Sequence, residues 1–123
     1  MSHSGGEIMD TLVTVIIGLL SVFFIFAGSI KLLGWQKMIF EKQLEFFHSY
    51  GLNRQIMAVV GVVELIGATS IWLQSSILGV LGAALLLATS LGAIFFHLRF
   101  DTWKDGVPAM LTLILSGVVI FLA

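Results

Sequence analysis

Three ionisable residues, Lys31, Glu64 and His97, stand in or at the ends of long apolar segments, where such side chains are costly. An ammonium and a carboxylate that meet in an apolar interior can form an ion pair, and a histidine can hold or pass a proton. Thr89, Ala93 and His97 are spaced four residues apart and share one helix face, which adds a hydroxyl group. The candidate ligand-binding or buried polar cluster therefore consists of Lys31, Glu64, Thr89 and His97.

Four apolar segments position these side chains, each long enough to cross about 30 Å of hydrocarbon as a helix. In lipid a helix is the default, because every backbone N–H and C=O must be satisfied within the segment. The sequence predicts an all-α fold, an integral membrane four-helix bundle that forms one domain over residues 1–123. We expect the spans at about residues 11–33, 54–73, 75–98 and 105–123.

The composition excludes several classes of protein. Of the 123 residues, 59% are hydrophobic and only 11% are charged, whereas a soluble domain has about 25% charged residues. Six Lys and Arg residues against seven Asp and Glu residues give no basic excess for binding a nucleic acid. Since the chain has no cysteine, disulfides, thiolate metal sites and Cys-x-x-Cys redox chemistry are excluded.

The segment at about residues 36–49 is too polar to cross the membrane and has two unlike faces. Its apolar face carries Ile39, Phe40, Leu44, Phe46 and Phe47, and its polar face carries Lys37, Glu41, Lys42, Glu45 and His48. This pattern predicts a short amphipathic helix between the first two spans, in the membrane interface or over the mouth of the bundle.

The basic residues set the orientation in the membrane. All six lie in the first and third connecting segments or at the adjoining span ends, namely Lys31, Lys37, Lys42, Arg54, Arg99 and Lys104. Lys and Arg near span ends favour the cytoplasmic side. We therefore expect a multi-pass protein of the cell (inner) membrane with both termini on the non-cytoplasmic side.

Glu64 lies near the membrane midplane, about 15 Å along its helix from Arg54. Helical side chains lean toward their own N-terminus, so that Lys31 and His97 lean toward Glu64 from the neighbouring spans. Three interpretations stay open: an ion pair with Lys31 that only locks the helices, a binding or proton-handling site, or a fortuitous protonated acid. The first two are compatible.

Small residues one turn apart predict close helix contacts, at Gly61, Glu64 and Ala68 in the second span and at Ala84, Ala88 and Gly92 in the third. Glu45 and His48 match the Glu-x-x-His spacing of di-iron bundles, which needs a second such motif and further carboxylates. The chain has no second motif, so we expect no metal site and no catalytic residue.

Four strings resemble the DoxX-like family of small four-helix membrane proteins. They are Phe26-Ala-Gly-Ser-Ile-Lys-Leu-Leu-Gly34, Phe47-His-Ser-Tyr-Gly-Leu52, Val60-Gly-Val-Val-Glu-Leu-Ile-Gly67 and Gly92-Ala-Ile-Phe-Phe-His97. The resemblance implies that Lys31, Glu64 and His97 are the polar signature of the family. Some relatives are subunits of thiosulfate:quinone oxidoreductases or partners in redox assemblies. Others in the wider superfamily use cysteine pairs, which this chain lacks.

The resemblance and the polar cluster together suggest a non-catalytic membrane subunit or a module that binds a quinone or another lipophilic ligand for a redox enzyme. No intrinsic cofactor is expected, only a bound quinone or lipid. Partners would be membrane lipid and a redox enzyme or a second copy of the chain. The alternatives are a proton-coupled small-molecule transporter that uses Glu64, and an assembly factor for membrane proteins.

Overall fold

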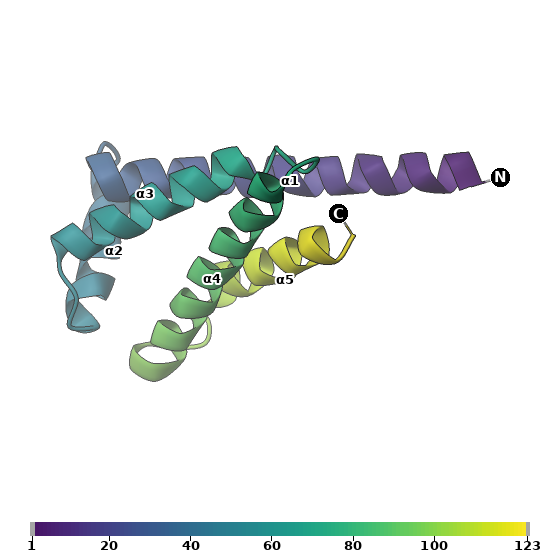
Figure 1. Ribbon diagram of the computed structural model, residues 1–123. Coiled ribbons are helices and arrows are strands. Elements are labelled where there is room, and N and C mark those ends of the chain that lie inside the picture. Colours follow the sequence, from purple (N-terminus) through teal and green to yellow (C-terminus); the bar gives the residue numbers. More distant parts are fainter. Residues whose placement is uncertain (1, 123) are drawn as a thin grey trace.

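The computed structural model describes the backbone of residues 2–122 and the side chains of residues 6–122. Residues 2–122 form the helices drawn in Figure 1, which are α1 (Ser2–Leu33), α2 (Lys37–Ser49), α3 (Arg54–Ser70), α4 (Ile77–Phe100) and α5 (Val107–Leu122). Residues 2–122 contain no strand, which confirms the all-α fold class. Residues 1 and 123, the ends of the predicted domain, lie outside this range.

Most helix ends differ from the predicted segments by a few residues, but the start of α1 lies nine residues before the predicted one. Helix α1 begins at Ser2, well before residue 11, because the polar segment there holds no proline and helix propagates from the apolar turns that follow. Gln36 caps α2, and its side chain accepts a hydrogen bond from the Ile39 backbone N–H at 3.0 Å. Helix α3 ends at Ser70, and a turn leads to α4.

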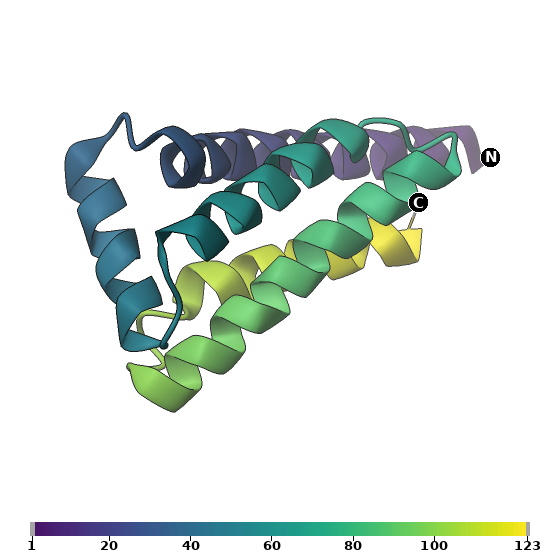
Figure 2. The same cartoon turned by 60° about the vertical axis from the view of Figure 1, so that its left-hand side comes forward.

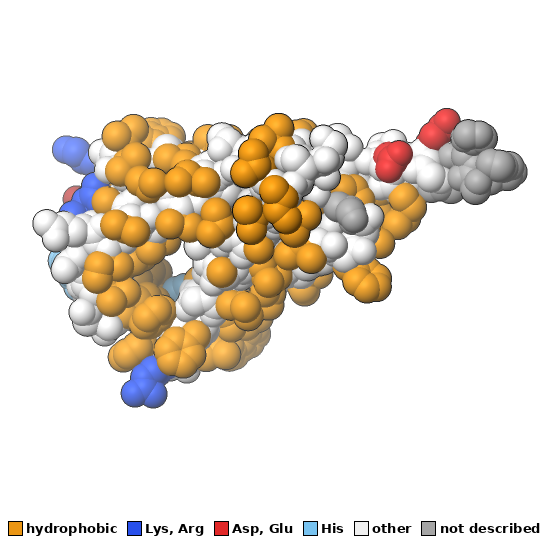
Figure 3. All heavy atoms as spheres, viewed as in Figure 1, with side chains coloured by type: hydrophobic (Ala, Val, Ile, Leu, Met, Phe, Trp, Pro, Cys, Tyr) orange, Lys and Arg blue, Asp and Glu red, His pale blue; other side chains and the backbone are white. Residues whose placement is uncertain are grey.

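Helices α1, over Gly6–Leu33, and α4 are long and apolar enough to cross a membrane. Helix α5 is apolar but shorter, and α3 is bent by 116° against α2. Large apolar side chains lie on the outside, for example Val22 and Phe121, which are 71% and 88% exposed. Figure 3 shows this apolar surface over much of one face, with Lys and Arg toward the end that carries α2. Such a surface suits lipid and not water.

The four long helices pack as two pairs, α1 with α3 and α4 with α5, which meet mainly through α3 and α4. Figure 2 shows the two pairs converging at the turn between α3 and α4 and diverging toward α2. The hydrophobic core fills the convergent half and consists of Ile16, Ile17, Leu20, Phe24, Ala68, Ile71, Ala83, Leu86 and Val119.

Glycines explain this wedge shape. A Cβ atom on Gly82 would lie 2.6 Å from the Ile71 backbone nitrogen, so α3 and α4 touch backbone to backbone at the convergent end. A Cβ atom on Gly92, further along α4, would meet no atom within 4 Å. The predicted contact seam at Ala84, Ala88 and Gly92 is therefore wrong, because α4 buries a different face that begins with Gly79 and Gly82.

Helix α2 lies across the divergent end of the wedge (Figure 2). The residues of its predicted apolar face, including Phe46 and Phe47, are half-buried, and its charged residues are exposed, as the amphipathic pattern requires. The chain enters and leaves α2 through Gly34 and Gly51, whose φ angles of 68° and 81° favour glycine. The sharp turns at both ends thus depend on glycine.

Candidate functional site

Lys31 of α1 and Glu64 of α3 form a buried ion pair. The Lys31 Nζ atom lies 2.9 Å from the Glu64 Oε1 atom, and the two side chains are 9% and 7% exposed. Beyond this ion pair, Oε1 has no hydrogen-bond partner among the described residues. The contact is therefore mainly electrostatic, and the carboxylate can still accept a hydrogen bond.

Glycine contacts bring this pair together. A Cβ atom on Gly28 would lie 2.8 Å from the Gly61 carbonyl oxygen, and one on Gly61 would lie 2.7 Å from the Gly28 carbonyl oxygen. Lys31 and Glu64 each follow one of these glycines by one helical turn and so face each other across the contact. The predicted small-residue seam at Gly61 is present, and it sets the distance between the charges.

Arg54 fixes the end of α1 beside the pair. Its two terminal guanidinium nitrogens donate hydrogen bonds to the backbone carbonyls of Lys31 and Leu32, both at 2.7 Å. These carbonyls belong to the last turn of α1, where the helix itself supplies no donors. The Arg54 guanidinium also lies 4.8 Å from the Phe40 ring, which links α2 to this corner.

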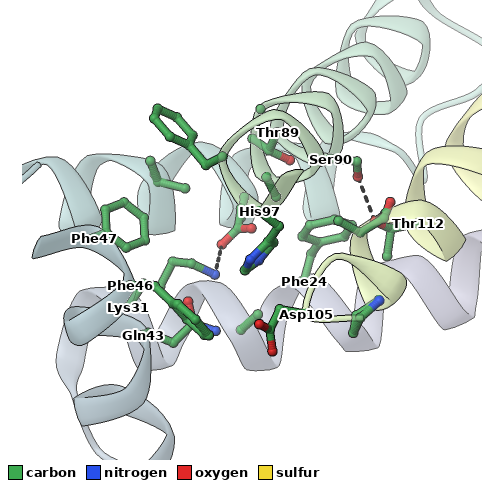
Figure 4. Close-up of a pocket in the computed structure, with 18 of the residues that line it drawn as sticks. Phe24, Lys31, Gln43, Phe46, Phe47, Thr89, Ser90, His97, Asp105 and Thr112 are labelled. Carbon is green, nitrogen blue, oxygen red and sulfur yellow. Dashed lines mark hydrogen bonds and ion pairs between the residues drawn. The ribbon is translucent and has the colours of Figure 1, made fainter. Parts of the chain in front are cut away.

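A cavity of about 410 Å³ opens between the two helix pairs, beneath α2. All four predicted site residues line it, and Figure 4 shows the Lys31 side chain, with a dashed line for its ion pair, and the His97 ring at its wall. Five phenylalanines supply much of the apolar surface, namely Phe23, Phe24, Phe46, Phe47 and Phe96. A cavity of this size with few polar groups on an apolar wall is typical of small-molecule sites.

His97 does not join Glu64 directly. Its Nδ1 atom lies 2.9 Å from Asp101 Oδ2 and 3.1 Å from the Tyr50 hydroxyl, and this hydroxyl donates to Asp101 Oδ2 at 2.6 Å. Burial raises the pKa of Tyr50, and the hydrogen bond to Asp101 and the negative charges of Asp101 and Asp105 raise it further. The Tyr50, His97 and Asp101 cluster thus ties the end of α2 to α4.

Hydroxyl groups complete the cavity wall. Thr89 lines the cavity, but its hydroxyl donates to the Leu86 carbonyl of its own helix at 3.0 Å and does not bind Glu64. Ser90 and Thr112, which sequence reasoning missed, lie 2.6 Å apart between α4 and α5 (Figure 4). The positions of Ser90 and Thr112 are those of ordinary helix-packing residues, so nothing in the sequence identifies them as site residues.

Tyr50 and Asp101 were also missed as site residues. Its place in the Phe47 to Leu52 string marks Tyr50. Asp101 stands four residues after His97, a spacing that places the two on one helix face. Within the described residues, no group of three His, Asp or Glu side chains could hold a metal ion.

The cavity can bind and orient a ligand through its ion pair, its histidine and its aromatic walls. Comparison of the chain with curated proteins and with solved structures finds no match. The model of the DoxX-like family matches residues 15–120, a range that contains all four predicted site residues. The resemblance seen in the sequence is thereby confirmed, and this membrane protein belongs to the DoxX-like family.

Proposed function

We propose that the protein is a four-span membrane protein whose cavity binds a lipid-soluble ring compound of the quinone class. The single observation that carries this proposal is the placement of Lys31, Glu64 and His97 on the wall of one aromatic-lined cavity of about 410 Å³. A planar ring can stack on phenylalanine side chains, and the few polar groups can fix its oxygen atoms.

Helices α1 and α4 are long enough to cross the membrane, and we propose that α3 and α5 are two further, short spans. Helices α3 and α5, of 17 and 16 residues, are about 25 Å long, close to the shortest spans that cross a bilayer. The basic residues gather at the α2 end, whereas Glu7 and Asp10 lie on the N-terminal part of α1. We therefore place the cavity and α2 toward the cytoplasmic side of the inner membrane, with both termini on the other side.

We further propose that the protein acts as a non-catalytic subunit or ligand-binding module for a membrane redox enzyme. The cavity side chains offer charge, hydrogen bonds and aromatic surface, and the chain has no cysteine for electron transfer. The redox change would then belong to the bound ring and to the partner enzyme. Membrane lipid would surround the apolar outer surface.

Cavity filling tests this function. A Cβ atom on Gly92 meets open space, so that Gly92→Phe should place a ring in the cavity without disturbing the helix contacts. Leu91→Phe adds a ring on the other side of α4, where Leu91 is 50% exposed, and serves as the matched control. Each variant is purified from native membranes, and its bound lipophilic molecules are identified by mass spectrometry.

We expect a prenylated quinone or quinol to copurify with the wild type and Leu91→Phe, and to be lost from a folded Gly92→Phe variant. The same molecules on all three proteins, or no ring compound on the wild type, would contradict the proposal. Fluorescence-detected gel filtration of each variant verifies that it is folded.

Proton-coupled transport by Glu64 is the second candidate, and one observation favours it, namely a buried carboxylate on a cavity wall. A transporter must expose its acid to both sides of the membrane in turn. Access to Glu64 from the convergent end of the bundle is closed, because α3 and α4 touch there through Gly67 and Gly82. We therefore place ligand binding first.

A further inference from the structure

Two polar atoms on the cavity wall have unused hydrogen-bonding capacity. Glu64 Oε1 is buried and accepts no hydrogen bond from any described residue. Lys31 Nζ carries three N–H donors, and its only polar contact among the described residues is the ion pair with Oε1. A buried charged group without a hydrogen bond is costly, so a ligand that supplies the missing bonds gains affinity.

We infer that the ligand presents a hydroxyl group to Lys31 and Glu64, accepting a hydrogen bond from Nζ and donating one to Oε1. This inference rests on the proposed function, because it names the chemistry of the ligand in the same cavity. A carbonyl or ether oxygen can only accept, and it would leave Oε1 without a donor. The pair thus recognises a hydroxyl group and disfavours groups that only accept.

When its imidazole is neutral, His97 offers a second acceptor to the same ligand. The Tyr50 hydroxyl uses its proton on Asp101 Oδ2, so the Nδ1 atom of His97 must be the donor in its contacts with Tyr50 and Asp101. In a neutral imidazole that carries its proton on Nδ1, Nε2 is an acceptor. His97 lines the cavity, and Figure 4 shows its ring beside the ion pair.

A ring with two hydroxyl groups matches these acceptors better than its dicarbonyl form. The reduced, quinol form of a quinone has two O–H donors, whereas the oxidised form has none. The cavity should therefore hold the quinol form more tightly than the quinone form. Binding alone gives this preference, and no bond is made or broken.

Two probes with the same ring and alkyl chain, of which only one has O–H donors, test the inference. These are 2-decylhydroquinone and its dimethyl ether, 2-decyl-1,4-dimethoxybenzene, each titrated against the protein in detergent by quenching of tryptophan fluorescence. Ascorbate keeps the hydroquinone reduced, and the protein has no cysteine whose redox state could change. We expect the hydroquinone to bind about tenfold more tightly than the ether, since an unpaired buried acceptor costs on that order.

The double variant Lys31→Met with Glu64→Gln shows whether the ion pair causes this preference. It keeps the side-chain sizes similar and leaves no single buried charge, so it should fold where either single change fails. The ratio of the two affinities should fall to about a third or less of the wild-type ratio, because the anionic acceptor is gone. If the methyl groups are rejected by their size alone, the ratio will stay unchanged in the double variant.

Equal affinity of the wild type for both probes, or tighter binding of the ether, would overturn the inference and leave the proposed function intact. Binding of neither probe to the wild type would overturn both proposals. An unchanged ratio in a folded double variant would overturn the role of Lys31 and Glu64 while the cavity remains a ligand site. Each of these results is distinguishable from the others.

Discussion

Gly28 of α1 and Gly61 of α3 lie against each other where the two helices cross. A Cβ atom on either glycine would collide with the carbonyl oxygen of the other. One turn further along each helix stand Lys31 and Glu64, which therefore meet at 2.9 Å. The charges alone do not set this distance. It follows from the absence of two side chains, which lets the backbones approach closely.

Substitution of Gly61 by alanine should weaken this crossing. The added methyl group would lie 2.7 Å from the Gly28 carbonyl oxygen and 3.0 Å from Lys31 Cβ. Relief of this clash requires a shift of the α1 backbone, which costs packing energy. We expect a loss of about 1–3 kcal/mol in the free energy of unfolding, measured in detergent. Gly117→Ala is the control, since its new Cβ atom would lie 3.9 Å from Leu87. Equal losses in both variants would count against the close crossing.

The ion pair predicts coupling between Lys31 and Glu64. Lys31→Met or Glu64→Gln alone strands one buried charge, and breaking such a pair costs about 3–5 kcal/mol. The double variant strands neither charge and should lose much less than the sum of the two single changes. A double-mutant cycle on unfolding free energies measures this coupling. Strict additivity would mean that Lys31 only extends toward the headgroups and does not stabilise Glu64.

The sequence predicts some contacts of the candidate site and misses others. The meeting of Lys31 and Glu64 follows from the direction in which helical side chains lean, and the structure has that contact. The same reasoning brings His97 to the cavity but misses its partners Tyr50 and Asp101, which depend on where the chain turns after α2 and α4. A turn placed by Gly51 cannot be oriented from periodicity alone.

The cavity itself was not predictable, because it arises from the angle between helix pairs. The sequence marks Gly92 as a small residue suited to close packing, yet its position holds open space. The contact between α3 and α4 instead uses Gly67 and Gly82 at the other end. Phe46, Phe47 and Phe96 line the cavity, whereas Phe40 and Phe95 do not. Phe95 is 60% exposed on the outside.

Tyr50 should resist ionisation in the folded protein. Burial and Asp101 raise its pKa above the usual value near 10, so the folded state favours the protonated phenol. The stabilisation is complete below about pH 10 and is lost as pH rises through the folded-state pKa. Tyr50 is the only tyrosine, so absorbance at the tyrosinate band reports it alone. Asp101→Asn should move the transition to lower pH, and an unmoved transition would argue against the contact.

The proposed orientation predicts opposite labelling of the two ends. Glu7 and Lys42 are exposed, and the chain has no cysteine of its own, so Glu7→Cys and Lys42→Cys each give a single reactive site. A membrane-impermeant maleimide should label Glu7→Cys in intact cells and Lys42→Cys only after the inner membrane is opened. Labelling of Lys42→Cys in intact cells would reverse the orientation given by the basic residues.

The most direct test of ligand recognition at the ion pair is ¹³C NMR of the glutamate carboxyl groups. The chain has glutamates at positions 7, 41, 45 and 64, the first three are exposed, and Glu64→Gln identifies the remaining signal. On addition of 2-decylhydroquinone, the Glu64 signal should shift while the three exposed signals stay fixed. The dimethyl ether should leave the Glu64 signal nearly unchanged. If Glu64 stays fixed at saturating hydroquinone, the ligand does not bind the ion pair and the central claim fails.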